Sequence, residues 1–280
     1  MSQKIRVAHS PDSDDAFMFY GLASGAVKVE GLEFVHELAD IETLNRAALE
    51  GRYEITALSV HAYAHLHDKY MLLDSGASFG DGYGPTVVVD AQSQFLRTEE
   101  LARARIAIPG KWTSAALALS LRLPHHEPVV VDFKEVGRLV KMGKVEAGLV
   151  IHEGQLTARE EGLRVVEDLG RTWKERTGLP LPLGMNAVRK DLPEPTRRAL
   201  ARVMTETVAY GLEHREKALD HAMTYARGLD RKKADQFVGM YVNEWTRDLG
   251  PRGREAVALF LKESADRGLV PRVVPEFQER

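Results

Sequence analysis

The regular alternation of short apolar runs with amphipathic stretches is the feature that most constrains how this chain can fold. Apolar, β-branched runs at 5–8, 34–38 and 54–60 indicate strands, and a helical pattern follows each of them. A chain in which strands alternate with helices favours an α/β fold with parallel strands over a sandwich or a helix bundle. The first part of the chain therefore predicts three βα units.

A second α/β series interrupts the first. A glycine-dense segment at 74–85 precedes an apolar strand at 86–89, which we interpret as a crossing between two lobes. One lobe is thus expected to be inserted into the other. The elements expected after the crossing are strands at 105–108, 129–133 and 147–151, helices at 112–123 and 134–142, a return strand at 181–188 and a mainly helical segment at 195–268.

An insertion through two crossing strands is typical of the two-lobed, type II periplasmic-binding-protein fold, which is an α/β fold. We expect lobe 1 to comprise 1–88 plus 186–280, including the C-terminal helices, and lobe 2 to comprise 89–185. Closure of such a fold buries a ligand against the carboxyl ends of strands and the N-termini of the helices that follow them. The sequence therefore predicts a cleft that closes around one small organic anion.

Composition excludes several classes of function. The net charge is −3 with both signs interspersed, so there is no basic stripe for a nucleic acid, and the absence of cysteine excludes disulfides, thiolate zinc sites and iron–sulfur clusters. No apolar run approaches the roughly 20 residues that cross a bilayer, and the first residues carry no secretory signal. We therefore expect a cytoplasmic protein without nucleic-acid or membrane partners, while its C-terminal helices leave an oligomer open.

Two segments on different lobes offer groups that suit an anion. One begins a helix directly after the Pro109-Gly110 turn, where backbone N–H groups and hydroxyls favour a carboxylate, and the other is the end of the third strand. The alternative for the first segment is that Thr113 only caps the helix. The groups expected to face the ligand are the hydroxyls of Thr113 and Ser114, with the backbone N–H groups beside them, and the hydroxyl of Ser59 at the strand end.

Carboxylates crowd the expected helix start after the first strand. Asp14 and Asp15 would repel an anion there, so they are candidates for a different role. One of them could accept hydrogen bonds from ligand hydroxyls or hold the other lobe. The alternative is that these first-turn acids only complement the helix dipole.

His152 directly follows the apolar strand at 147–151, where it would open onto the cleft. With an unperturbed pKa of about 6.5, a neutral imidazole can take up a proton at neutral pH. The alternative is a histidine that only hydrogen-bonds a ligand or a strand end, and position alone does not decide between them. No metal is expected, because His61 and His65 lie one helical turn apart without a third ligand nearby, and a polar helix face explains them.

The order of several short motifs along the chain is a further signal. They are Ser10-Pro11 with Asp15, the segment 40–45, Leu58-Ser59, Gly84-Pro85, Ile108-Pro109-Gly110, Thr113-Ser114-Ala115, the segment 146–153 with its Ile-His-Glu ending, and Thr-Gly-Leu-Pro-Leu-Pro-Leu-Gly at 177–184. In this order they resemble the 1,4-dihydroxy-6-naphthoate synthase family, which acts in the futalosine route to menaquinone. The resemblance runs from the first strand to the C-terminal helices, and the last two motifs are its most specific parts.

This resemblance implies a lyase that converts cyclic dehypoxanthinyl futalosine to 1,4-dihydroxy-6-naphthoate, with no metal or organic cofactor. His152 would be the proton acceptor, and an aryl carboxylate of the substrate would bind at Ser114. The resemblance further implies that the family's substrate contacts fall on Ala57, Leu58 and Ser59 at the strand end and on Ser114 and Ala115 at the helix start. Asp12-Ser13-Asp14 stands where the family has Cys-Pro-Asn, which leaves the role of Asp14 open, and Ser114 stands where the family has threonine, which keeps the hydroxyl.

Two other functions remain open from the sequence. A protein of this fold could close on a small carboxylate without reacting, as a cytoplasmic binding protein. It could also be chorismate dehydratase, a sister enzyme of the same route on the same fold. The Ile-His-Glu segment at 151–153 distinguishes the lyase from the dehydratase, because no equivalent segment is expected in the dehydratase.

Overall fold

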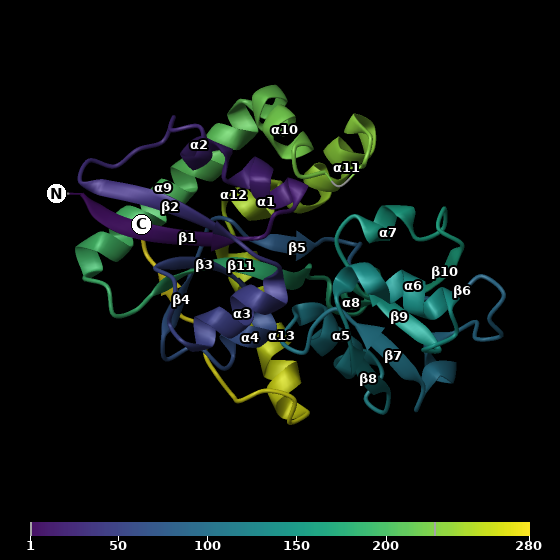
Figure 1. The fold of residues 1–280 in the computed structure, drawn as a ribbon. Helices are drawn as coiled ribbons and strands as arrows, with labels where there is room; N and C mark the ends of the chain where they lie inside the picture. Colours follow the sequence, from purple (N-terminus) through teal and green to yellow (C-terminus); the bar gives the residue numbers. More distant parts are fainter. Residues whose placement is uncertain (1, 227) are drawn as a thin grey trace.

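Two β-sheets with helices packed around them make up the structure, a computed structural model that describes residues 2–226 and 228–280 (Figure 1). The larger sheet contains β1 (Gln3–His9), β2 (Leu32–Leu38), β3 (Ile55–Ser59), β4 (Tyr70–Leu73), β5 (Ser78–Gly80), β11 (Leu181–Arg189) and β12 (Phe277–Gln278). Its order is β12-β4-β11-β3-β1-β2, with β5 paired to β11. β1 is parallel to β2 and β3, whereas β11 is antiparallel to β3, β4 and β5.

The smaller sheet is formed by the middle of the chain. It contains β6 (Thr86–Asp90), β7 (Arg105–Ile108), β8 (Glu127–Val130), β9 (Ala147–Val150) and β10 (Leu163–Asp168). Its order is β10-β6-β9-β7-β8, and β7 is parallel to both β8 and β9 while β6 is antiparallel to β9 and β10. The chain therefore enters this sheet after β5 and returns to the larger sheet at β11.

Helices cover both sheets (Figure 1). Those in the segments that form the larger sheet are α1 (Ser13–Met18), α2 (Tyr20–Ala23), α3 (Ile41–Leu49), α4 (Val60–Tyr63), α9 (Glu194–Glu213), α10 (Arg215–Met223), α11 (Arg231–Tyr241), α12 (Glu244–Arg247) and α13 (Gly250–Asp266). Those in the middle segment are η1 (Thr98–Leu101), α5 (Ser114–Arg122), η2 (Phe133–Glu135), α6 (Val136–Lys141), α7 (Gly154–Thr157) and α8 (Leu169–Thr177). None of the helices in the described part of the chain combines the length and apolarity that a bilayer crossing requires.

The predicted α/β fold with two sheets is confirmed, but the prediction missed β4, β5, β10 and β12. β4 and β5 have only four and three residues, and they are held by pairing with β11, more than 100 residues away, which no local pattern reveals. The helix expected to include His61 and His65 ends at Tyr63. The lobe boundaries at 88/89 and 185/186 stay a prediction.

The two sheets meet where α3 approaches the turn before α5. Glu42 on α3 accepts a hydrogen bond from the backbone N–H of Trp112 at 2.9 Å, and it is buried although it is charged. Gly110 makes this approach possible, because a Cβ at that position would lie 2.5 Å from Oε2 of Glu42. Apolar residues from both sheets, among them Leu58 and Leu149, also join in one hydrophobic core. This junction lies directly beside the pocket described next.

Candidate active site

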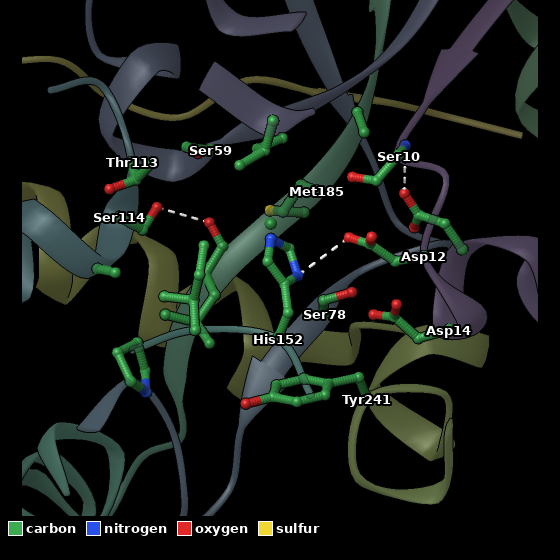
Figure 2. Close-up of a pocket in the computed structure, with 18 of the residues that line it drawn as sticks. Ser10, Asp12, Asp14, Ser59, Ser78, Thr113, Ser114, His152, Met185 and Tyr241 are labelled. Carbon is green, nitrogen blue, oxygen red and sulfur yellow. Dashed lines mark hydrogen bonds and ion pairs between the residues drawn. The ribbon is translucent and has the colours of Figure 1, made fainter. Parts of the chain in front are cut away.

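A pocket lies between the elements of the two sheets (Figure 2). Its walls come from the carboxyl ends of strands and the starts of helices, as the fold predicts. The residues that line it are Ser10, Asp12, Asp14, Asp15, Ile41, Ala57, Ser59, Gly76, Ser78, Pro85, Thr113, Ser114, Ala115, Ile151, His152, Gln155, Leu183, Gly184, Met185, Asn186, Phe237 and Tyr241.

The N-terminus of α5 forms one wall of the pocket. Thr113 caps this helix, because its Oγ accepts a hydrogen bond at 3.2 Å from the backbone N–H three residues later. The N–H groups of Ser114 and Ala115 lie in the first turn, where the helix itself offers no acceptor, and they favour an anion. The hydroxyl of Ser114 donates to the carbonyl oxygen of Leu183 at 2.5 Å and accepts from the N–H of His61. The backbone of this turn is therefore better placed than the Ser114 hydroxyl to donate to a carboxylate.

The end of β3 contributes a second wall. Ala57 and Ser59 line the pocket. Leu58 lies between them in the strand, and because successive side chains point to opposite faces, its side chain is fully buried in the core. The side chain of Asn45 accepts from the N–H of Ser59 at 2.9 Å and donates to the Ser59 hydroxyl at 3.0 Å. Asn45 thus fixes the position of Ser59 in the wall.

His152 contacts Asp12 at the edge of the pocket. Just after β9 the chain turns through His152, whose φ of 55° lies in the left-handed region that is uncommon for a residue with a Cβ. Nδ1 of His152 lies 3.0 Å from Oδ2 of Asp12, which stands at the N-terminus of α1. The ring of Phe133 contacts the imidazole edge-on, with the two centroids 4.9 Å apart. Nε2 lies on the side of the ring away from Asp12 (Figure 2).

The acidic surroundings of His152 change its protonation. Burial lowers the pKa of His152, but the charge and hydrogen bond of Asp12, together with the charges of Glu153 and Asp14, outweigh it and raise the pKa to about 9. The ring in the free site is therefore mostly protonated at neutral pH, in contrast to the neutral ring that an unperturbed pKa of about 6.5 predicts. A carboxylate beside an imidazole stabilises its charged form, which is the physical origin of this shift.

Asp14 and Asp15 are both buried beside this pair. Asp15 accepts a hydrogen bond from the backbone N–H of Ser10 at 2.7 Å, yet burial and the charge of Asp12 raise the pKa of Asp15 to about 7. Burial also raises the pKa of Asp14 well above its usual value, and the charges of Asp15 and Asp12 act in the same direction. A protonated Asp14 can donate a hydrogen bond as well as accept one. Acidic residues that only complement a helix dipole need not be buried, so the helix dipole alone does not explain the burial of Asp14 and Asp15.

Phe237, Tyr241 and Asn186 are among the pocket residues that were not predicted from the sequence. Phe237 and Tyr241 lie four residues apart on α11, and this spacing is typical of an ordinary helix core. Asn186 is a polar residue within the apolar strand β11, and that interruption is a signal that could have identified it. Its Nδ2 donates to the carbonyl oxygen of Gly76 at 3.0 Å, whereas its buried Oδ1 has no hydrogen-bond partner among the described residues.

The histidines considered as metal ligands have other surroundings. Nδ1 of His61 lies 3.2 Å from the carbonyl oxygen of Thr113, and burial lowers the pKa of His61 to about 4. His61 and His65 both contact the ring of Trp112. Within residues 2–226 and 228–280, no group of three histidine or carboxylate side chains is arranged to bind a metal ion. His61 therefore supports the start of α5 rather than a metal.

Comparison with known proteins assigns the chain to a family. A family model described as menaquinone biosynthesis matches residues 5–266. A protein of Thermus thermophilus named 1,4-dihydroxy-6-naphtoate synthase is 43% identical over 267 residues, which cover 95% of this chain and 96% of the relative. A protein of Streptomyces coelicolor with the same name is 34% identical over 279 residues, covering 97% and 96% of the two chains.

Solved structures agree with the fold. A crystal structure of a protein from Archaeoglobus fulgidus has a TM-score of 0.89 at 45% identity and covers 95% of this chain and 98% of its own. The alkanesulfonate-binding protein of Xanthomonas axonopodis, bound to MOPS, has a TM-score of 0.75 at 12% identity, covers 98% of this chain and 97% of its own, and shows the periplasmic-binding-protein fold alone. The match of the family model over most of the chain and the identity to these relatives show the family: the chain belongs to the menaquinone-biosynthesis family that includes the 1,4-dihydroxy-6-naphtoate synthases.

Proposed function

We propose that this chain is a lyase that converts cyclic dehypoxanthinyl futalosine to 1,4-dihydroxy-6-naphthoate, with His152 as the proton acceptor. The names of the relatives support the product. The observation that carries the proposal is the pairing of two opposite chemistries in one pocket. The start of α5 favours an anion, and a buried imidazole with a carboxylate partner lies in the same enclosure.

The two chemistries fit the two ends of such a substrate. An aryl carboxylate accepts hydrogen bonds from the N–H groups of Ser114 and Ala115 at the start of α5. The apolar side chains of Ile41, Ile151 and Leu183 line the pocket and suit the flat rings. The hydroxyl groups of the former ribose would then face the polar residues that line the pocket.

Neutral His152 accepts a proton from the bound substrate through Nε2, in the role of a general base. The electron pair left on the substrate drives cleavage of the C–C bond to the remainder of the former ribose, and the second ring becomes aromatic as the naphthoate is released. Enclosure of the pocket excludes water from the anionic species during this step. The positive N-terminus of α5 keeps the carboxylate, and with it the reacting bond, in one orientation.

A direct assay tests this function. Purified protein incubated with cyclic dehypoxanthinyl futalosine should form 1,4-dihydroxy-6-naphthoate, followed by liquid chromatography and mass spectrometry, and chorismate offered in parallel should remain unchanged. Consumption of chorismate would identify a dehydratase instead. Binding of the futalosine derivative in a calorimeter without any product would identify a binding protein.

The pH dependence of the reaction should reflect the raised pKa of His152. With a pKa of about 9, only on the order of one imidazole in a hundred is neutral at pH 7. Because only the neutral ring accepts a proton, we expect kcat/KM to rise about tenfold per pH unit from pH 6 to about pH 8 and to level off above pH 9. Steady-state rates in buffers of constant ionic strength measure this profile, and a constant kcat/KM across the range would argue against His152 as a base.

A further inference from the structure

Asp12 contacts the imidazole of His152 from a different part of the fold. Asp12 precedes α1, in the part of the chain that forms the larger sheet, whereas His152 follows β9 of the smaller sheet. Their side chains nevertheless meet at 3.0 Å between Oδ2 and Nδ1, with the Asp12 side chain only 2% exposed. This ion pair therefore joins the two halves of the protein across the pocket.

The geometry of the contact determines which nitrogen of His152 faces the ligand. A carboxylate has no hydrogen to donate, so Oδ2 of Asp12 accepts the hydrogen on Nδ1. The lone pair of the neutral ring is then on Nε2, on the side away from Asp12 (Figure 2). Without this partner, the neutral ring could place its hydrogen on either nitrogen, and only one of the two forms offers Nε2 as an acceptor.

The backbone and the neighbouring ring hold His152 in place for this contact. Its φ of 55° lies in a region where side chains with a Cβ are rare, so the surrounding structure must maintain it. Phe133 supports the ring on a second side. A strained residue with a buried ionic partner is typical of functional sites.

We infer that Asp12 is the positioning residue of His152: it fixes the tautomer that presents Nε2 to the substrate and aligns the ring when the two halves of the protein enclose the pocket. Asp12 does not touch the reacting bond in this role. The inference rests on the proposed function, because it assigns Asp12 a task in proton transfer by His152. It adds to that function a role for Asp12, which was not predicted from the sequence.

Asp12 is one of several ionisable groups around the imidazole. Asp14 and Asp15 follow it in α1, Glu153 is adjacent to His152, and Tyr241 approaches from α11. Among the groups that raise the pKa of His152, Asp12 contributes most, through both charge and hydrogen bond. Removing its charge should therefore lower the pKa of His152 by about 1–3 pH units while the other groups remain.

The variants Asp12→Asn and Asp12→Ala test this role. Rates are compared above pH 9.5, where the imidazole of every variant is mostly neutral, so that differences in protonation contribute little. We expect kcat on this plateau to fall at least tenfold in Asp12→Ala and further in Asp12→Asn, because the asparagine amide can donate to Nδ1 and so favour the wrong tautomer. KM should change less than kcat, and the rising limb of kcat/KM should move to lower pH in both variants.

The matched control is Asp191→Asn, which removes an exposed carboxylate that pairs with Arg189 and does not line the pocket, and it should leave the profile unchanged. NMR titration of the His152 ring measures its pKa in the same proteins without any substrate. Plateau rates of both Asp12 variants within twofold of the parent, or an unchanged pKa of His152, would overturn the inference. If the parent forms no naphthoate, the proposed function fails, and the NMR titration still decides whether Asp12 controls the ring.

Discussion

Replacement of His152 by alanine is expected to lower kcat by about 10²–10⁴-fold, the usual contribution of a general base. Among the described residues that line the pocket, His152 is the one histidine, and no lysine or arginine lines it; Nε2 of its ring lies away from Asp12. Substrate binding should be affected less, because the start of α5 remains intact in the variant. Single-turnover measurements with cyclic dehypoxanthinyl futalosine separate the chemical step from binding.

Two further proteins keep this result interpretable. His152 has a φ of 55°, and asparagine tolerates this conformation better than alanine, so His152→Asn should retain the fold while losing the base. His125→Ala removes an exposed histidine from a loop and should leave kcat unchanged. A His152→Asn variant that is folded by circular dichroism and keeps more than a third of the parent rate would contradict the assignment.

Insertion of a single methyl group at Gly110 is expected to lower kcat/KM by about a hundredfold, the size of effect that a misplacement of about 1 Å produces in a catalytic site. The Cβ of Gly110→Ala would lie 2.5 Å from Oε2 and 2.8 Å from Cβ of Glu42. Either the turn before α5 or α3 must move, which weakens the hydrogen bond from Trp112 to Glu42. The anion-binding start of α5 would then no longer be aligned with His152.

Gly239→Ala is the matched control for this substitution. Gly239 is exposed on α11, and a Cβ there would come no nearer than 3.6 Å to another group, Nη2 of Arg215. This variant should keep kcat/KM and gain slightly in stability, because alanine is the better helix former. Both proteins should be compared by thermal unfolding as well as by rates. If Gly110→Ala retains kcat/KM within twofold, the approach of α3 to α5 is not required for catalysis.

The contact between Glu42 and Trp112 shows that α3 depends on interactions between sequence neighbours and also on interactions with residues far away in the chain. The residues of α3 themselves predict this helix, since Asp40 caps it by accepting from the N–H of Thr43 at 3.0 Å and its apolar residues Leu44 and Ala48 are buried. That Glu42 also binds the backbone of Trp112, 70 residues away, has no local signature. The short strands β4 and β5 were missed for the same reason, because distant partners stabilise them.

The candidate site likewise contains some residues with a local sequence signal and others without one. His152, Ser59 and the start of α5 were identified because they stand at the ends of predicted strands and helices, and the structure brings them to one pocket. The strand period explains why Leu58 instead points into the core. Asn186, buried in β11 with an unsatisfied Oδ1, was overlooked because only the neighbouring elements turn that strand position into pocket wall.

The sequence by itself determined the α/β class, the position of His152 after an apolar strand and the helix start at Ser114, because periodicity and capping are properties of neighbouring residues. Only the tertiary structure decided the protonation of His152 and its partner. Asp12 lies 140 positions earlier in the chain, and its charge acts on the imidazole only because folding places the two groups 3.0 Å apart in a buried environment. Electrostatic interactions depend on distance in space and on burial, and neither is written in the local pattern of a sequence.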